Sequence, residues 1–342
     1  MKLNRAFALA LVFLAFVFSS HAQPVNVQQF QNTQTARQLQ SPLPGLRTAT
    51  NAPEIYPGEN ADTGPQRILR LTPRPDYFAV VLDSQVFYSD NANFAEHDHR
   101  FHSSVFVNTF QVAFTPPDIQ LGPGKFAPAI GYISQWYNYS SSAMEGFDFN
   151  AQTAFVSGRY TLGNWQFGLG GNYTRLVNQP NYGNQTYSEW LPALTVQRSF
   201  PVNDSLAFII GNQVDYHFTH VPTFNSISTN SVSTNNISSS NGSGEVNNRF
   251  DEAVNLTVSW QVNRQLNVQP YCRYQYSRYR SGLGNGLDNN LYSVGITLAY
   301  YFNQNVSVRT FYNYNIKHSN DPSAAGYTES ESGVGAAVNI TF

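Results

Sequence analysis

The sequence predicts an all-β protein, a transmembrane antiparallel up-and-down β-barrel of about 12 strands that follows an extended N-terminal arm. Three observations favour this fold. Apolar residues recur at every second position through much of residues 77–342. The connections between these stretches alternate between short and long, and the composition combines many aromatic residues with few charges. Strands that present one face to lipid and the other to water require this combination.

The composition separates this chain from ordinary soluble domains. Of its 342 residues, 15% are aromatic and 12% are charged, whereas soluble domains carry about 25% charged residues. The net charge of −2 provides no basic surface that would hold a polyanion. We therefore expect no nucleic-acid partner.

Residues 1–22 have the pattern of a secretory signal peptide. Lys2 and Arg5 form the basic start, residues 6–18 form the apolar run, and Ser20 and Ala22 provide a small-x-small cleavage site. The apolar run is shorter than the roughly 20 residues that a membrane-spanning helix needs. A membrane location would therefore depend on strands.

Residues 23–76 differ from the rest of the chain, because Gln, Asn, Thr and Pro dominate them. Proline lacks a backbone donor and interrupts both helices and strand ladders. We predict that this segment is an extended periplasmic arm, with a plug inserted into the barrel lumen as the alternative. Its prolines are Pro24, Pro42, Pro44, Pro53, Pro57, Pro65, Pro73 and Pro75.

About 12 strands are predicted in residues 77–342. The last is typical, because Val334, Ala336, Val338, Ile340 and Phe342 alternate with small or polar residues, as on the two faces of a strand. The alternation is least regular in the third, fourth and sixth strands, where β-bulges would fit. The predicted strands cover residues 77–89, 104–115, 127–140, 147–162, 165–177, 186–200, 206–221, 249–262, 266–280, 287–302, 306–318 and 327–342.

The connections support a barrel over a soluble β-sandwich. Outer-membrane barrels have short turns at one end and long loops at the other, whereas sandwich strands are usually about 5–6 residues long. One link, 116–126, is long where a short turn is expected. The tight links are 163–164, 201–205, 263–265 and 303–305, and the long links are 89–103, 141–146, 178–185, 222–248, 281–286 and 319–326.

The C-terminal strand resembles the terminal strand of bacterial outer-membrane β-barrels, which carries Gly-x-x-Φ-x-Φ and a final Phe. Gly335, Val338, Ile340 and Phe342 occupy those positions, and Val334 stands where that family has a polar residue. The resemblance implies a Gram-negative outer membrane with both barrel ends in the periplasm. It also implies that outer-membrane lipid and the barrel-assembly machinery are partners, and that these four residues serve as the assembly signal.

Charged side chains at membrane depth must face water or a partner, so the charged strand residues are expected in the lumen. They would either brace the wall or set the selectivity of a pore. We expect a porin-like channel for passive diffusion of small polar solutes or ions, with no cofactor. The alternative is an occluded structural or surface-binding, adhesive barrel acting through outer loops such as the Ser/Asn-rich segment 222–248. The lumen candidates are Asp83, Asp215, His217, Arg273, Arg309 and Lys317.

The sequence contains candidates for two further types of site. His97, His99 and His102 would bind zinc or copper if the first long loop brought them together, although their spacing matches no specific metal motif. Some outer-membrane barrels of about 12 strands are phospholipases with a Ser–His–Asn site. No matching Ser lies near His217 in the pattern, so a lipid hydrolase is the third hypothesis and we predict no enzymatic activity.

Overall fold

The computed structural model describes residues 25–40, 77–95, 100–179, 185–220, 248–281, 285–320 and 326–342. The predicted signal peptide, residues 41–76 of the arm and nearly all of the Ser/Asn-rich segment 222–248 lie outside the described residues.

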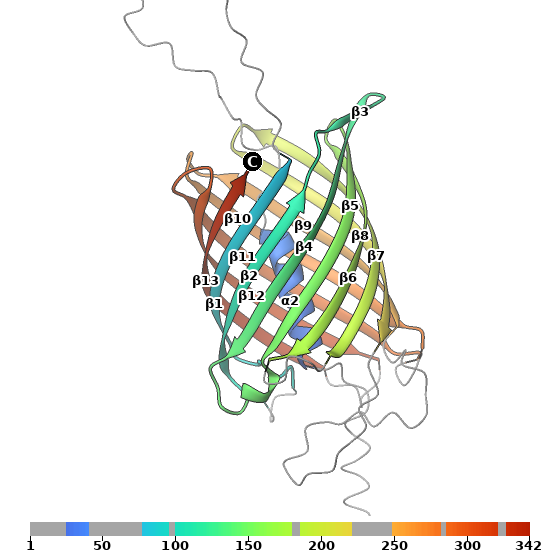
Figure 1. Ribbon diagram of the computed structural model, residues 1–342, viewed down its shortest axis with the longest axis vertical. Coiled ribbons are helices and arrows are strands. Elements are labelled where there is room, and N and C mark those ends of the chain that lie inside the picture. The colour runs from blue at the N-terminus through green and yellow to red at the C-terminus, as the bar shows by residue number, and fades with distance from the viewer. Residues whose placement is uncertain are drawn as a thin grey trace, which may run out of the picture.

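Twelve long antiparallel strands form a closed barrel in the described part of the chain, as the sequence predicts (Figure 1). Each strand pairs with its neighbours in sequence, and the last strand pairs with the first. These strands are β1 (Phe78–Ser89), β2 (Ser103–Phe114), β4 (Gly124–Tyr139), β5 (Phe149–Leu162), β6 (Trp165–Asn178), β7 (Gln185–Asn203), β8 (Leu206–His220), β9 (Arg249–Gln261), β10 (Leu266–Tyr279), β11 (Asp288–Tyr301), β12 (Val306–Ser319) and β13 (Tyr327–Thr341).

The seam between β1 and β13 closes the barrel. Its register runs from Ala79 opposite Thr341 to Ser89 opposite Glu331. At its end, the backbone N–H of Phe78 donates to the carbonyl of Phe342 at 3.0 Å, and the N–H of Phe342 donates back to Phe78 at 3.0 Å. Because both edges of the sheet are paired, the long strands expose no free edge.

The two faces of the wall differ as a membrane barrel requires. Leu82 and Val294 point outward and are 49% and 50% exposed, whereas the alternating neighbours Asp83 and Gln85 are buried in the lumen. Two sets of exposed aromatic residues lie near the two ends of the strands, which is the arrangement of interfacial girdles. Phe78, Phe114, Trp165, Phe200, Trp260, Phe302 and Phe342 lie at the tight-turn end, and Tyr88, Phe106, Trp190, Phe218 and Tyr292 lie at the long-loop end.

The irregular parts of the wall explain the less regular parts of the pattern. The long link 116–126 contains a short strand, β3 (Ile119–Leu121), which pairs with the start of β4 through a turn at Gly122 (φ 59°). Strand β4 therefore begins at residue 124 and not at 127. Register shifts occur where the start of β7 pairs with β6, at Leu176/Val177, and near the end of β7, at Pro201/Asn203. The pairing of β4 with β5, the third and fourth predicted strands, keeps one register throughout.

The extended conformation predicted for the arm is wrong for residues 25–40. They form helix α2 (Val25–Gln40), which lies inside the barrel (Figure 1). Between Pro24 and Pro42 the sequence has no proline and six glutamines, and Gln is a good helix former. In the described part of the chain, no helix combines the length and the apolar character needed to cross a membrane. A short 3-10 turn, η2 (Glu145–Phe147), lies in a long loop.

Candidate functional site in the barrel lumen

Helix α2 contacts the wall beside the seam through amide donors. Gln29 Nε2 lies 3.3 Å from Glu331 Oε1, and Asn32 Nδ2 lies 3.2 Å from Glu329 Oε2. Both glutamates are buried. Glu329 also accepts a hydrogen bond from Ser89 Oγ at 2.9 Å. The helix therefore supplies donors to two carboxylates that are shielded from bulk water.

Further along the helix, Arg37 pairs with Asp83 of β1 at 2.5 Å. Arg309 of β12 binds the same carboxylate through two contacts, Nη1 to Oδ2 at 2.6 Å and Nη2 to Oδ1 at 3.0 Å. Arg309 also donates to Gln85 at 2.9 Å. The predicted lumen residues Asp83 and Arg309 thus pair with each other. The helix adds a second cation, Arg37, which belongs to the segment predicted to be an extended arm.

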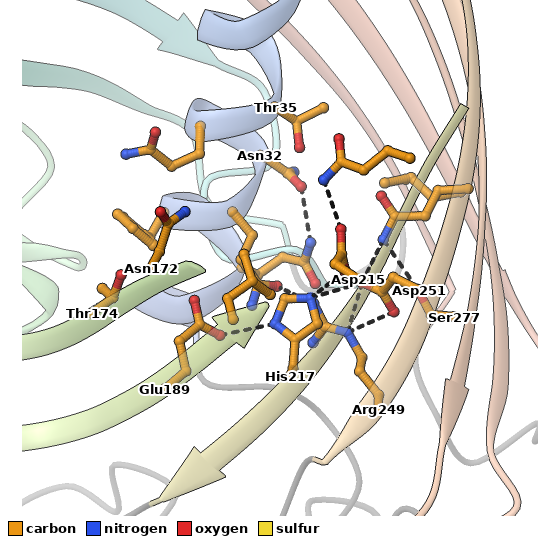
Figure 2. Close-up of a pocket in the computed structure, with 18 of the residues that line it drawn as sticks. Asn32, Thr35, Asn172, Thr174, Glu189, Asp215, His217, Arg249, Asp251 and Ser277 are labelled. Atoms are coloured by element: carbon orange, nitrogen blue, oxygen red, sulfur yellow. Dashed lines mark hydrogen bonds and ion pairs between the residues drawn. The ribbon is translucent and has the colours of Figure 1, made fainter. Parts of the chain in front are cut away.

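Strands β7, β8 and β9 carry a buried ionic cluster on the part of the wall away from the β1–β13 seam. The imidazole Nδ1 of His217 lies 2.9 Å from Glu189 Oε2. Its Nε2 lies 3.1 Å from Asp215 Oδ1 and 3.1 Å from Asp251 Oδ2. Figure 2 shows the ring between Glu189 on one side and the two aspartates on the other. All four side chains are buried, so these charges depend on one another and not on water.

Arg249 connects this cluster to the helix. Its Nε lies 2.9 Å from both carboxylate oxygens of Asp251, and its Nη2 donates to Gln31 of α2 at 2.9 Å. Arg273 donates to Gln275 at 2.9 Å, and Gln275 donates to Asp251 at 2.9 Å. The helix is therefore hydrogen-bonded to opposite parts of the wall.

A set of apolar side chains also packs around the helix inside the lumen. Val27 and Phe30 of α2 are buried against inward-facing residues of the wall near the long loops. Tyr137 and Phe149 stack there with ring centroids 4.3 Å apart. The other members are Phe87, Ala92, Val105, Val107, Tyr139, Met144, Ala151, Leu176, Tyr187 and Phe311. This half of the lumen is therefore packed like a small protein core.

A cavity of about 330 Å³ remains between the other face of the helix and the wall (Figure 2). This volume is within the range of small-ligand sites, roughly 300–1,000 Å³. Gln28, Gln31, Gln34 and Thr35 line it from the helix. From the wall it is lined by, among others, the predicted lumen residues Asp215, His217, Arg273 and Lys317, and also by Glu189, Arg249 and Asp251. Five of the six lumen candidates are thus in contact with the cavity or with α2, and Arg309 reaches α2 through Asp83.

The loop histidines remain a prediction. His97 and His99 lie outside the described residues, and His102 is exposed with its ring stacked on Tyr88 at 6.3 Å. The lipid-hydrolase hypothesis requires a Ser beside His217. The imidazole of His217 instead contacts three carboxylates and the guanidinium of Arg249.

The residues of the predicted assembly signal lie on both faces of β13. Gly335 faces the lumen, where an added Cβ would lie 3.0 Å from the Cβ of Gln85 and 3.3 Å from the Arg309 guanidinium. Val338, Ile340 and Phe342 are exposed on the outer face. The glycine therefore provides room for the ion pair of Arg309, and the three apolar residues face lipid.

A closed antiparallel barrel with an apolar outer face, two aromatic girdles and a polar lumen defines a porin-like outer-membrane β-barrel of bacteria. A family model described as "Putative beta-barrel porin 2" matches residues 202–340. A search of curated proteins finds no match.

Several solved structures are similar to this chain. An outer-membrane channel from Pseudomonas putida F1 is 9% identical, with a TM-score of 0.51, over 78% of this chain and 96% of that one. The NanC porin is 11% identical, with a TM-score of 0.40, over 76% of this chain and 100% of that one. The DcaP channel of Acinetobacter baumannii is 11% identical, with a TM-score of 0.39, over 77% of this chain and 96% of that one. At 9% identity, the likeness to the Pseudomonas putida channel concerns the fold alone.

Proposed function

We propose that this protein is an outer-membrane channel for passive diffusion of small polar solutes or ions, and that helix α2 sets how far the lumen is open. The observation that carries the proposal is the polar cavity of about 330 Å³ between α2 and a wall that carries both signs of charge. A barrel of 12 strands lies between about eight strands, which are filled by side chains, and about sixteen, which leave an open channel. A single helix is therefore enough to narrow the path.

The way in which α2 is held supports a reversible restriction. Its polar contacts are hydrogen bonds to charged groups and one ion pair, each worth about 1.5–3 kcal/mol net because water replaces them when the helix leaves. The mixed charges of the wall, such as Asp215 and Arg273, favour weak selectivity over a filter for one sign. Solutes would pass beside the helix or after its displacement.

In the orientation that we propose, the tight turns and both ends of the barrel face the periplasm. The C-terminal part of α2 lies nearer this end, because Arg37 pairs with Asp83 in the middle of β1, whereas Asn32 reaches Glu329 near the long loops. The arm would then enter the lumen from the periplasmic side. The barrel-assembly machinery would recognise β13 from the same side.

Conductance of the purified protein in planar lipid bilayers tests this function. A variant without residues 23–40 is expected to show a larger and steadier open-channel current than the wild type. A variant without residues 45–62, a segment of equal length in the same arm, is the matched control and is expected to behave like the wild type. If neither the wild type nor the helix deletion conducts while both are folded, the channel proposal is wrong.

The second candidate is an occluded barrel that acts through its outer loops. The burial of Val27 and Phe30 in the apolar set around the helix favours it, because exposing such side chains to water costs about 1.5–3 kcal/mol each in addition to the lost polar contacts. The same bilayer experiment separates the two functions. A wild type that stays silent while the variant without residues 23–40 conducts supports occlusion by the helix, and a wild type that conducts supports the channel.

A further inference from the structure

We propose that Asp215, His217 and Asp251 form a binding site for one divalent first-row transition metal ion in the barrel lumen. This site is independent of whether the lumen conducts solutes. One imidazole with two carboxylates is a ligand set for Zn²⁺, Mn²⁺ or Fe²⁺, whereas Mg²⁺ and Ca²⁺ prefer oxygen ligands throughout.

The spacing of the donor atoms fits a single ion. His217 Nε2 lies 3.1 Å from Asp215 Oδ1 and 3.1 Å from Asp251 Oδ2, and the three donors lie within 4.8 Å of one another. Metal–ligand bonds of about 2.1 Å place neighbouring donors about 3.0 Å apart at octahedral angles and about 3.4 Å apart at tetrahedral angles. An ion would therefore bind with small movements of side chains.

The imidazole is already oriented for coordination. Its Nδ1 lies 2.9 Å from Glu189 Oε2, and the same oxygen accepts a hydrogen bond from the Tyr187 hydroxyl at 2.8 Å. A carboxylate that holds Nδ1–H leaves the lone pair of Nε2 free, and this arrangement recurs behind metal-binding histidines. Here Nε2 faces the oxygens of Asp215 and Asp251, so either a proton or a metal ion must lie between the three atoms.

The acceptor on Asp215 depends on what occupies Nε2 of His217. Oδ1 of Asp215 belongs to a side chain that is only 7% exposed, and among the described residues it has no hydrogen-bond donor other than His217 Nε2 at 3.1 Å, which donates only when it carries a proton. Leaving such an acceptor unsatisfied costs about 1–3 kcal/mol, and more for a charged group. The atom is directed into the cluster at the edge of the cavity of about 330 Å³, which gives water or a solute oxygen access to the remaining coordination positions.

A proton competes with the metal ion. Without metal, a proton on His217 Nε2 is shared with the two aspartates. Arg249 adds a positive charge beside them, because its Nη2 lies 3.3 Å from His217 Nε2 and its Nε donates to the carboxylate of Asp251. Arg273 and Lys317 also line the cavity and weaken cation binding. Binding of the ion releases the proton, so its affinity is expected to rise with pH.

Zinc titration of the full-length protein, folded in detergent and stripped with a chelator, tests the proposal. We expect one Zn²⁺ per chain in competition with a chromophoric chelator. X-ray absorption is expected to show one imidazole nitrogen and carboxylate oxygens at about 2.0–2.2 Å. His217→Gln and Asp215→Asn are expected to lower the affinity at least 100-fold. Glu189→Gln, which removes the orienting carboxylate, is expected to lower it about 10–100-fold.

His102→Gln is the matched control, because it makes the same substitution at an exposed histidine of the first long loop. It is expected to keep the wild-type affinity. Loss of binding in His102→Gln with retention in His217→Gln would assign the ion to that loop and overturn the proposal. A wild-type protein that binds no stoichiometric Zn²⁺, or a spectrum with two or more imidazoles, would also overturn it. If His217→Gln does not fold, the X-ray absorption spectrum of the zinc-loaded wild type decides whether one imidazole coordinates the ion.

Discussion

The guanidinium of Arg37 lies 2.5 Å from Oδ1 of Asp83, so the lumenal helix is ion-paired with the first strand of the barrel. The carboxylate of Asp83 is 3% exposed and also binds Arg309 of β12. One acidic residue therefore balances two cations, one on the wall and one on the helix. The two ion pairs differ in structural role, because Arg309 belongs to a strand of the wall, whereas Arg37 belongs to the lumenal helix.

Substitutions at this pair are expected to have unequal effects on the barrel. Arg37→Gln leaves the pair of Asp83 and Arg309 intact, so the free energy of unfolding should fall by about 1 kcal/mol or less. Asp83→Asn removes the buried carboxylate that both guanidinium groups share and should cost about 3 kcal/mol. Urea unfolding followed by tryptophan fluorescence measures both values. Equal losses would contradict the unequal roles of the two cations.

A negative charge on the helix beside Glu329 is expected to weaken its position in the lumen. Asn32→Asp replaces an amide donor 3.2 Å from Glu329 Oε2 with a carboxylate, and two like charges at this distance repel strongly where water is scarce. We expect a several-fold larger single-channel conductance. Gln34→Glu is the control, because it makes the same change in charge beside the uncharged Gln135. Equal conductance in the two variants would show that Glu329 has no part in holding the helix.

The outer face is expected to reject charge in proportion to its depth in the membrane. Val294 lies at the middle of β11 and is 50% exposed, whereas Val202 lies near the end of β7 and is 59% exposed. Val294→Arg should cost about 2–4 kcal/mol and Val202→Arg about 0–1 kcal/mol. Reversible unfolding in lipid vesicles measures the difference. Similar costs at the two positions would be inconsistent with hydrocarbon around the middle of the barrel.

The terminal aromatic residue is expected to matter for assembly more than for stability. Phe342 is 63% exposed and stacks on Phe78 with ring centroids 5.8 Å apart. Phe342→Ala should reduce the amount of folded protein in the outer membrane of cells several-fold, while the stability of the refolded barrel changes by about 1 kcal/mol or less. Phe302→Ala is the control, because this residue is 59% exposed at the same end of the barrel. Equal yields from the two variants would argue against a C-terminal assembly signal.

The strands were predictable because lipid on one side and a polar lumen on the other impose a period of two on the sequence. Val334, Val338 and Ile340 follow that period and point outward. Helix α2 was not predictable in this way. Most of its contacts with the lumen wall are made by polar side chains, and its buried apolar contacts are those of Val27 and Phe30, which are too few to give a recognisable apolar stripe. Its composition therefore resembles that of an unfolded segment.

The candidate site was only partly predictable. Asp215 and His217 could be assigned to the inward face of β8 from alternation within one strand. Their partners Glu189 and Asp251 come from neighbouring strands, and the register between strands is set by the whole sheet. Arg249 and Asp251 do lie two residues apart at the start of β9, which is a signal for a shared face. The weak alternation of β7 concealed Glu189.

The contacts of the helix with the seam brace the closure of the barrel from inside. Gln29 binds Glu331 on β13 and Arg37 binds Asp83 on β1, so one helix is fastened to both strands that meet at the seam. Moving the helix would therefore remove support from the line along which the cylinder is joined. The motion that widens the lumen would also make the wall easier to open.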